Sequence, residues 1–200
     1  MKKYKVILAS KSPRRREILS SLGVGFEVIS ADADESSDIT EPRALVQELA
    51  LRKGRATREL MKSRGALYDS TLIIASDTVV VLGDEILGKP SCKEDALRML
   101  SSLSGKEHRV ISGVALLTSD AEIASYEETL VKFAPLDTQD IERYVASGEV
   151  MDKAGAYAVQ GPAALWIEGI RGDYHSVVGL PVHRLNCLLK EFLGIQLIDL

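Results

Sequence analysis

The stretch that decides the fold is Val6-Ile7-Leu8-Ala9-Ser10-Lys11-Ser12-Pro13-Arg14-Arg15-Arg16-Glu17-Ile18-Leu19. An apolar run, a short polar turn and an amphipathic segment follow one another, which predicts a strand, a tight turn and a helix over Ser12–Leu22. Ser12 stands where the helix cap belongs, and Pro13 suits the first helical position. Strand-like and helical stretches keep alternating farther along the chain, as is typical of an α/β domain.

Three consecutive arginines, Arg14, Arg15 and Arg16, follow the cap of this predicted helix. They lie at the end where the helix dipole disfavours cations, so helix stability does not explain them. A helix N-terminus offers unpaired backbone N–H groups, and guanidinium groups bind phosphate through paired hydrogen bonds. The arrangement indicates an anion site, with a solvated basic first turn as the alternative.

Bulk properties narrow the class of protein. The 200 residues, 46% of them hydrophobic, suit a single domain over residues 1–200, with one lobe or two. The net charge of −4 argues against a general nucleic-acid partner, and no apolar run approaches the ~20 residues that span a membrane. Cys92 and Cys187 lie far apart without a metal-site spacing, so we expect a cytoplasmic protein.

Further elements follow from apolar periodicity and from helix start signals. Apolar runs predict strands and amphipathic runs predict helices, while Ser91 and Glu94 have the spacing of a capping box. The predicted strands cover 26–30, 71–76, 109–118, 122–133 and 163–170, and the predicted helices begin near residues 40, 91, 137 and 182. Asp77 stands at the C-terminal end of the predicted strand 71–76, and the chain continues extended over 78–82.

Asp77 follows the apolar run Ile73–Ser76, where open α/β sheets place their ligands. A carboxylate between apolar flanks needs a cation or a proton-transfer role, although a turn cap with Thr78 is the alternative. Asp34 and Glu35, in an acidic loop, offer further oxygen ligands for a divalent ion. Such loops are often only solvated, and that alternative stays open.

Two lysines extend the basic set that begins with Arg14 and Arg15. Lys89 lies between Gly88 and Pro90, which fix the backbone, whereas Lys53 lies on a predicted helix and could be an ordinary surface lysine. Residues 83–89 have the spacing of a phosphate-binding P-loop. However, Pro90 takes the place of the required Ser or Thr, so we reject that reading.

Together these cations and carboxylates suit the metal-assisted attack of water on a phosphoanhydride. The cations would neutralise the leaving group, and Asp77 would position or deprotonate the water. Gln160 lies beside Gly161, and its amide can pair with a nucleobase edge.

The same residues resemble the Maf proteins, a family of nucleoside triphosphate pyrophosphatases, over nearly the whole chain. The motifs that carry the resemblance are Leu8–Arg15, Glu35, Lys53, Ser76-Asp77-Thr78, Gly88-Lys89-Pro90, Leu103-Ser104-Gly105, Asp152–Tyr157 and Val178–Pro181. It implies an elongated, two-lobed, inosine-triphosphatase-like α/β fold with a central mixed sheet, flanking helices and a cleft between the lobes. It also implies a divalent cation, Mg²⁺ or Mn²⁺, and often a homodimer.

Within that family the chain is similar to the branch that hydrolyses dTTP and UTP to the monophosphate and pyrophosphate. Stretches 155–161 and 174–179 resemble this branch rather than the one acting on 7-methyl-GTP. A nucleotide-binding regulator of cell division without catalysis is a further alternative. The resemblance implies Asp77 as base, Glu35 and Asp77 as metal ligands, Arg14, Thr78 and Gln160 as specificity positions, and substrate binding by Ser10, Ser12, Arg14, Arg15, Lys53 and Lys89.

Three positions depart from the usual family pattern. Gly54 follows Lys53 where alanine is common, Ser76 precedes Asp77 where alanine is frequent, and Pro162 replaces a flexible residue. None of the three removes a proposed catalytic group.

Overall fold

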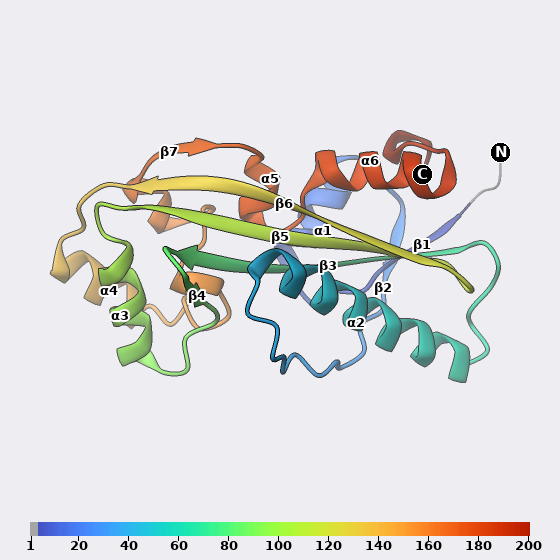
Figure 1. Cartoon of the computed structure of the whole chain (residues 1–200), viewed down its shortest axis with the longest axis horizontal. Coiled ribbons are helices and arrows are strands. Elements are labelled where there is room, and N and C mark those ends of the chain that lie inside the picture. Colours follow the sequence, from blue (N-terminus) through green and yellow to red (C-terminus); the bar gives the residue numbers. More distant parts are fainter. Residues whose placement is uncertain (1–3) are drawn as a thin grey trace. The chain divides into compact units, whose positions relative to one another are not determined.

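The computed structural model describes residues 4–200 (Figure 1). Its strands are β1 (Lys5–Leu8), β2 (Phe26–Val28), β3 (Thr71–Leu82), β4 (Glu85–Leu87), β5 (Glu107–Leu117), β6 (Glu122–Phe133) and β7 (Ile167–Arg171). Its α-helices are α1 (Pro13–Ser21), α2 (Pro42–Ser63), α3 (Lys93–Leu103), α4 (Thr138–Ala146), α5 (Tyr174–Val178) and α6 (Val182–Leu193). Three 3₁₀ turns cover Ala154–Ala156, Pro162–Trp166 and Leu197–Asp199.

The strands of the described chain form one mixed sheet in the order β2-β1-β3-β5-β6-β7, with β4 paired to β3. Strand β1 runs parallel to β2 and to β3, whereas β4 and β7 pair antiparallel with β3 and β6. The expected α/β fold with a central mixed sheet and flanking helices is therefore confirmed. The predicted strands 109–118 and 122–133 form the neighbouring strands β5 and β6, and in the turn between them the Thr118 amide donates to the Ala121 carbonyl (2.9 Å).

The described chain divides into two compact units. The first contains residues up to Asp77 together with Ser112–Glu127 and Gly179–Leu200, and the second contains Thr78–Ile111 and Glu128–Val178. The long strands β3, β5 and β6 contribute residues to both units.

In the first unit, α2 packs on the sheet. Ala50 and Met61 of α2 form a buried cluster with apolar residues of β1, β3 and β5, and α2 runs along the lower side of these strands in Figure 1. Gly54 faces Leu117, whose side-chain carbons would overlap a Cβ at that position. The close approach of helix and strand thus accounts for glycine where the family commonly has alanine.

In the second unit, aromatic side chains fill the space between the sheet and the helices. His108, Phe133 and Tyr157 meet edge to face with ring centroids 4.8–5.5 Å apart. Trp166 contacts Phe133 and Tyr144 in the same way. This cluster joins β5 and β6 to the segment that carries Gln160.

Several predicted boundaries are correct. Helix α6 has the predicted start, and α4 begins after Asp137, whose side chain accepts a hydrogen bond from the Gln139 amide (2.8 Å). Ser12 is the cap residue of α1 with extended backbone, but its side chain makes no capping hydrogen bond. Strand β4 lies inside the 83–89 stretch, which supports the rejection of a P-loop.

Other predictions were wrong in detail. Asp77 does not end a strand, because β3 continues without a break from Thr71 to Leu82 and Asp77 lies within it. The Ser91–Glu94 capping box does not form: Cys92 caps α3, and the Ser91 amide and hydroxyl instead bind Asp95 Oδ2 (3.0 and 3.2 Å). The predicted strand 163–170 begins as the 3₁₀ turn Pro162–Trp166, because proline suits the first position of such a turn.

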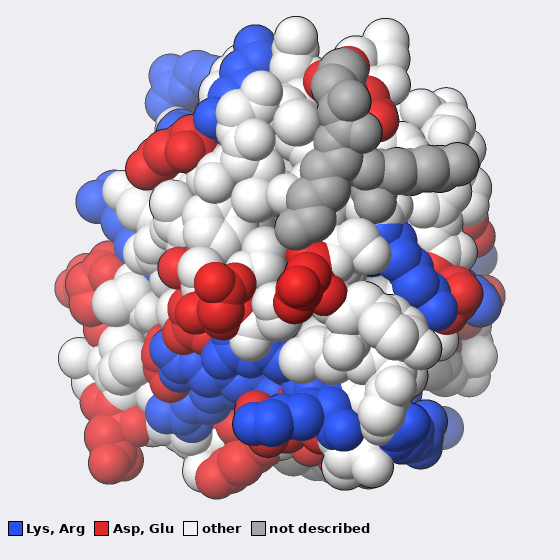
Figure 2. All heavy atoms as spheres, turned by 90° about the vertical axis from the view of Figure 1, so that its right-hand side faces the viewer, with Lys and Arg blue, Asp and Glu red and all other residues white. Residues whose placement is uncertain are grey.

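Charges of both signs lie close together on the protein surface. Figure 2 shows basic side chains gathered in the lower part of one face, with acidic side chains bordering them. The ion pairs of α2 follow the same pattern, since Arg55 and Arg58 both bind Glu122 (2.6 and 2.8 Å). No helix among residues 4–200 is long and apolar enough to cross a membrane.

Candidate active site

A lysine shared by two carboxylates is the centre of the candidate site. Lys53 Nζ, on α2, lies 3.0 Å from Glu35 Oε1 and in direct hydrogen-bond contact with Asp77 Oδ1 of β3. The Lys53 and Asp77 side chains are only 17% and 11% exposed, whereas that of Glu35 is 47% exposed. These three predicted residues come from separate elements of the first unit, and the fold brings them together.

Arg15 belongs to the same group of charges. Its Nε donates to the Gly179 carbonyl (2.8 Å), and its Nη1 donates to Ser10 Oγ (3.3 Å). Burial lowers the pKa of Arg15, while the negative charges of Asp77 and Glu35 oppose that shift. Arg15 therefore lies within electrostatic reach of both carboxylates of the candidate site.

Hydrogen bonds to the Ser10 side chain hold the turn between β1 and α1. The hydroxyl of this buried residue accepts hydrogen bonds from Arg15 and from the Ser12 amide (3.2 Å). Arg14 lies near enough to Arg15 to lower its pKa, as expected for adjacent cations. The predicted phosphate-binding turn is therefore built on the serine that precedes the cap, rather than on the cap side chain.

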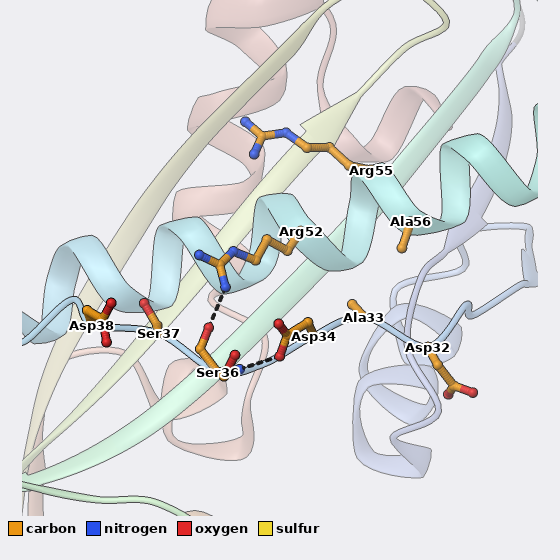
Figure 3. Close-up of a pocket in the computed structure, with 9 residues that line it drawn as sticks. All are labelled: Asp32, Ala33, Asp34, Ser36, Ser37, Asp38, Arg52, Arg55 and Ala56. Atoms are coloured by element: carbon orange, nitrogen blue, oxygen red, sulfur yellow. Dashed lines mark hydrogen bonds between the residues drawn. The ribbon is translucent and has the colours of Figure 1, made fainter.

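The acidic loop sends neighbouring carboxylates to different partners. Glu35 binds Lys53, whereas Asp34 Oδ1 accepts from the Ser36 amide (2.9 Å) and the Ser36 carbonyl accepts from Arg52 (2.5 Å). Figure 3 shows Asp34, Ser36 and Arg52 along a surface depression between the loop and α2, with Arg55 pointing away from the loop. Glu35 rather than Asp34 is thus the loop carboxylate at the candidate site.

The predicted residues Thr78, Lys89 and Gln160 belong to the second unit. The Gly155 amide donates to the Gly88 carbonyl (3.0 Å), so the Lys89 turn contacts the segment that leads to Gln160. Gly155 has φ +66° and packs so closely on Val80 that a Cβ would lie 2.9 Å from that side chain. These contacts within the second unit hold the Lys89 turn and Gly155 together, and Gly155 lies against Val80 of β3.

The residues present can hold a divalent cation. Glu35 and Asp77 each direct one carboxylate oxygen to the same amine, so both can reach one small cation. Mg²⁺ is often bound by one or two carboxylates, with waters and phosphate oxygens completing its shell. Among residues 4–200, no group of three or more His, Cys, Asp or Glu side chains forms a complete protein cage.

Ser76 and Gly179 are site residues to which sequence reasoning gave no role. Ser76 Oγ lies 2.7 Å from the Gly113 carbonyl oxygen and 2.9 Å from the Gly179 carbonyl oxygen, which Arg15 also binds. The position of Ser76 beside Asp77 was the available hint, but its partners are 37 and 103 residues away.

Comparison with known proteins decides the family. The model of the family described as "Maf-like protein" matches residues 5–192. The chain belongs to the Maf-like family. This membership confirms the resemblance inferred from the motifs, and it places the Lys53 cluster in a protein of that family.

Two relatives illustrate the similarity within the family. A protein of Symbiobacterium thermophilum is 46% identical over 188 residues, covering 94% of this chain and 93% of its own. One of Desulforamulus reducens is 45% identical over 196 residues, covering 96% and 98%. Both are named dTTP/UTP pyrophosphatase. Among solved structures, a HAM1 protein from Coxiella burnetii has a TM-score of 0.51 at 14% identity, covering 94% of this chain and 99% of its own, which supports the fold alone.

Proposed function

We propose that this Maf-like protein hydrolyses dTTP and UTP to the nucleoside monophosphate and pyrophosphate. The observation that carries the proposal is the Lys53 amine held between Glu35 and Asp77, with Arg15 in the same group of charges. Cations and carboxylates this close together suit phosphate binding and proton transfer at one place. The choice of substrates rests on the names of the relatives.

Asp77 is the proposed general base. Its carboxylate accepts a proton from a water molecule whose oxygen forms a bond to the α-phosphorus, while the bond from that phosphorus to the bridging oxygen breaks. Pyrophosphate leaves with the bridging oxygen. Lys53 orients the Asp77 carboxylate before the reaction, because its amine is in direct contact with Asp77 Oδ1.

Basic and hydroxyl side chains are proposed to bind the phosphates. Arg15 is oriented by Ser10 and Gly179, so a phosphate would meet a guanidinium of fixed direction. The proposed substrate-binding set is Ser10, Ser12, Arg14, Arg15, Lys53 and Lys89. Arg14, Thr78 and Gln160 are proposed to select the base, with the Gln160 amide pairing with the base edge.

Glu35 and Asp77 would hold a divalent cation, Mg²⁺ or Mn²⁺. Such an ion, when bound, lowers the negative charge on the phosphate oxygens. A homodimer, as the resemblance implies, and a cytoplasmic location stay predictions. Sedimentation equilibrium of the purified chain measures whether it is a monomer or a homodimer.

Product analysis across a panel of triphosphates tests the proposed function. The panel includes dTTP, UTP, 7-methyl-GTP and purine triphosphates, each assayed with Mg²⁺, with Mn²⁺ and after chelation. We expect monophosphate and pyrophosphate from dTTP and UTP, only with metal. Preferential cleavage of 7-methyl-GTP would assign the other branch, and orthophosphate release would indicate attack at the γ-phosphate. Binding without turnover across the panel would instead favour a regulator, and calorimetry alongside detects it.

The Asp77→Asn variant tests the proposed base. Removal of a general base is expected to lower kcat by about 100-fold or more. The matched control is Asp69→Asn, because Asp69 is an exposed carboxylate just before the opposite end of β3. Full activity of Asp77→Asn would show that another group deprotonates the water.

A further inference from the structure

Ser76 is a fully buried hydroxyl next to the proposed base. It lies in β3 immediately before Asp77, and none of its surface is exposed. Its Oγ is 2.7 Å from the Gly113 carbonyl oxygen of β5 and 2.9 Å from the Gly179 carbonyl oxygen before α6. A serine hydroxyl has one proton, so it donates to one carbonyl at a time or is shared between the two.

The Gly179 carbonyl oxygen links Ser76 to Arg15. Arg15 Nε donates to this oxygen over 2.8 Å, so the hydroxyl and the guanidinium share one acceptor. Gly179 has φ +122°, a conformation that favours glycine, and its carbonyl is therefore set by an unusual backbone turn. The direction of this carbonyl decides where the Arg15 side chain is anchored.

Arg15 has a second anchor in Ser10 Oγ, but that contact is longer (3.3 Å). The contact of Arg15 with the Gly179 carbonyl is thus the shorter of these two. Loss of the Ser76 hydroxyl would remove one donor from the buried Gly113 and Gly179 carbonyls, and Gly179 would keep its hydrogen bond from Arg15 Nε. The direction of the Gly179 carbonyl would then be fixed by one donor instead of two, so the carbonyl would turn and its bond to Arg15 would move with it.

We propose that Ser76 is a positioning residue that fixes Arg15 for phosphate binding through the Gly179 carbonyl. All four residues of this relay, Ser76, Gly179, Arg15 and Ser10, belong to the first unit. The inference rests on the proposed function, since it assigns Arg15 to the phosphates of the substrate. Ser76 itself touches neither the substrate nor the reacting atoms.

The Ser76→Ala variant tests the relay. We expect KM for dTTP to rise about tenfold, which corresponds to about 1.4 kcal/mol, with kcat changed less than about twofold. The dissociation constant of inorganic pyrophosphate, measured by calorimetry, should rise by the same factor. Ser76→Thr keeps the hydroxyl and should restore both values.

Thr71→Val is the matched control, because Thr71 is a fully buried hydroxyl at the opposite end of β3 that accepts from the Tyr68 amide (3.0 Å). This variant should lower Tm without changing KM or pyrophosphate affinity. The inference would be overturned if Ser76→Ala lowered Tm, as the control does, but left KM and pyrophosphate affinity unchanged. Ser76 would then have only a structural role.

A double-mutant cycle with Arg15→Lys separates the relay from independent effects, because lysine lacks the Nε donor to Gly179. In the Arg15→Lys background, Ser76→Ala should raise the pyrophosphate dissociation constant less than twofold. Additive effects would refute the relay even if Ser76→Thr failed to fold. Wild-type protein that bound pyrophosphate but cleaved no triphosphate would contradict the proposed function, while the cycle would still test the relay by binding.

Discussion

His108 is expected to make the protein less stable in mild acid. The side chain is 2% exposed and its Nε2 lies 2.7 Å from the Tyr157 hydroxyl, whereas its Nδ1 has no hydrogen-bond partner among the described residues. Phe133 and Tyr157 pack their rings against it. Burial in this apolar site lowers the pKa of His108 from 6.5 to about 4, because the imidazolium cannot be solvated there.

The direction of the pH effect follows from that difference. The unfolded chain binds the proton near pH 6.5 and the folded chain only near pH 4, so the contribution of neutral His108 is complete above pH 6.5. It is lost as the pH falls from 6.5 through about 4. The full loss is about 3 kcal/mol, and about 2 kcal/mol of it is reached by pH 5.

Urea unfolding at pH 7, 6 and 5 measures this contribution, with Trp166 fluorescence as the probe because this sole tryptophan lies in the same aromatic cluster. The His108→Gln variant lacks the titrating group but titrates like the wild type elsewhere. Between pH 7 and pH 5 the wild type should lose about 2 kcal/mol more unfolding free energy than the variant. If the unfolding free energy fell equally with pH in the wild type and in His108→Gln, the claim that folding desolvates His108 would be refuted.

Further substitutions test the packing of α2 on β5 and the capping of α4. Gly113→Ala should destabilise the protein by about 3 kcal/mol, because a Cβ there would overlap the Val46 carbonyl backbone of α2. Gly169→Ala, in a strand position with open space around the Cβ, should leave Tm nearly unchanged, and equal Tm values for both variants would contradict the close approach. Asp137→Ala should cost about 1 kcal/mol in urea unfolding, since Asp137 caps α4. An unchanged midpoint would mean that the cap contributes nothing.

The sequence predicted correctly those helices and strands whose ends are marked by residues typical of a boundary, such as proline and glycine. Helix α6 follows Pro181 and ends before Gly194, which has φ +68°, and both residues are standard helix boundaries. The 163–170 stretch carried no such marker after Pro162. An apolar run alone does not distinguish a strand from a short helical turn, so its first half was assigned wrongly. The helix α5 was missed because its five residues are too few for a periodic pattern.

The sequence predicted which residues belong to the candidate site, but not which of them contact one another. Glu35, Lys53 and Asp77 were each singled out from local sequence, yet only the packing of α2 on β3 shows that one amine serves both carboxylates. The role of Ser76 was beyond prediction for the same reason. Its two acceptors are backbone carbonyls, which every residue possesses, so no side-chain pattern marks them.

The charges of the first unit give a physical reason for the proposed cation requirement. Lys53 is already shared by Glu35 and Asp77, and the pKa of Arg15 responds to both carboxylates, so these two cations and two anions largely compensate one another. A triphosphate brought to this group alone would place phosphate oxygens beside two carboxylates, and like charges at short range oppose binding. Arg14 adds one positive charge, which is less than a triphosphate requires. Glu35 and Asp77 would therefore oppose binding of the proposed nucleotide alone and favour its complex with a divalent cation, so the carboxylates proposed for hydrolysis would also make binding depend on the metal.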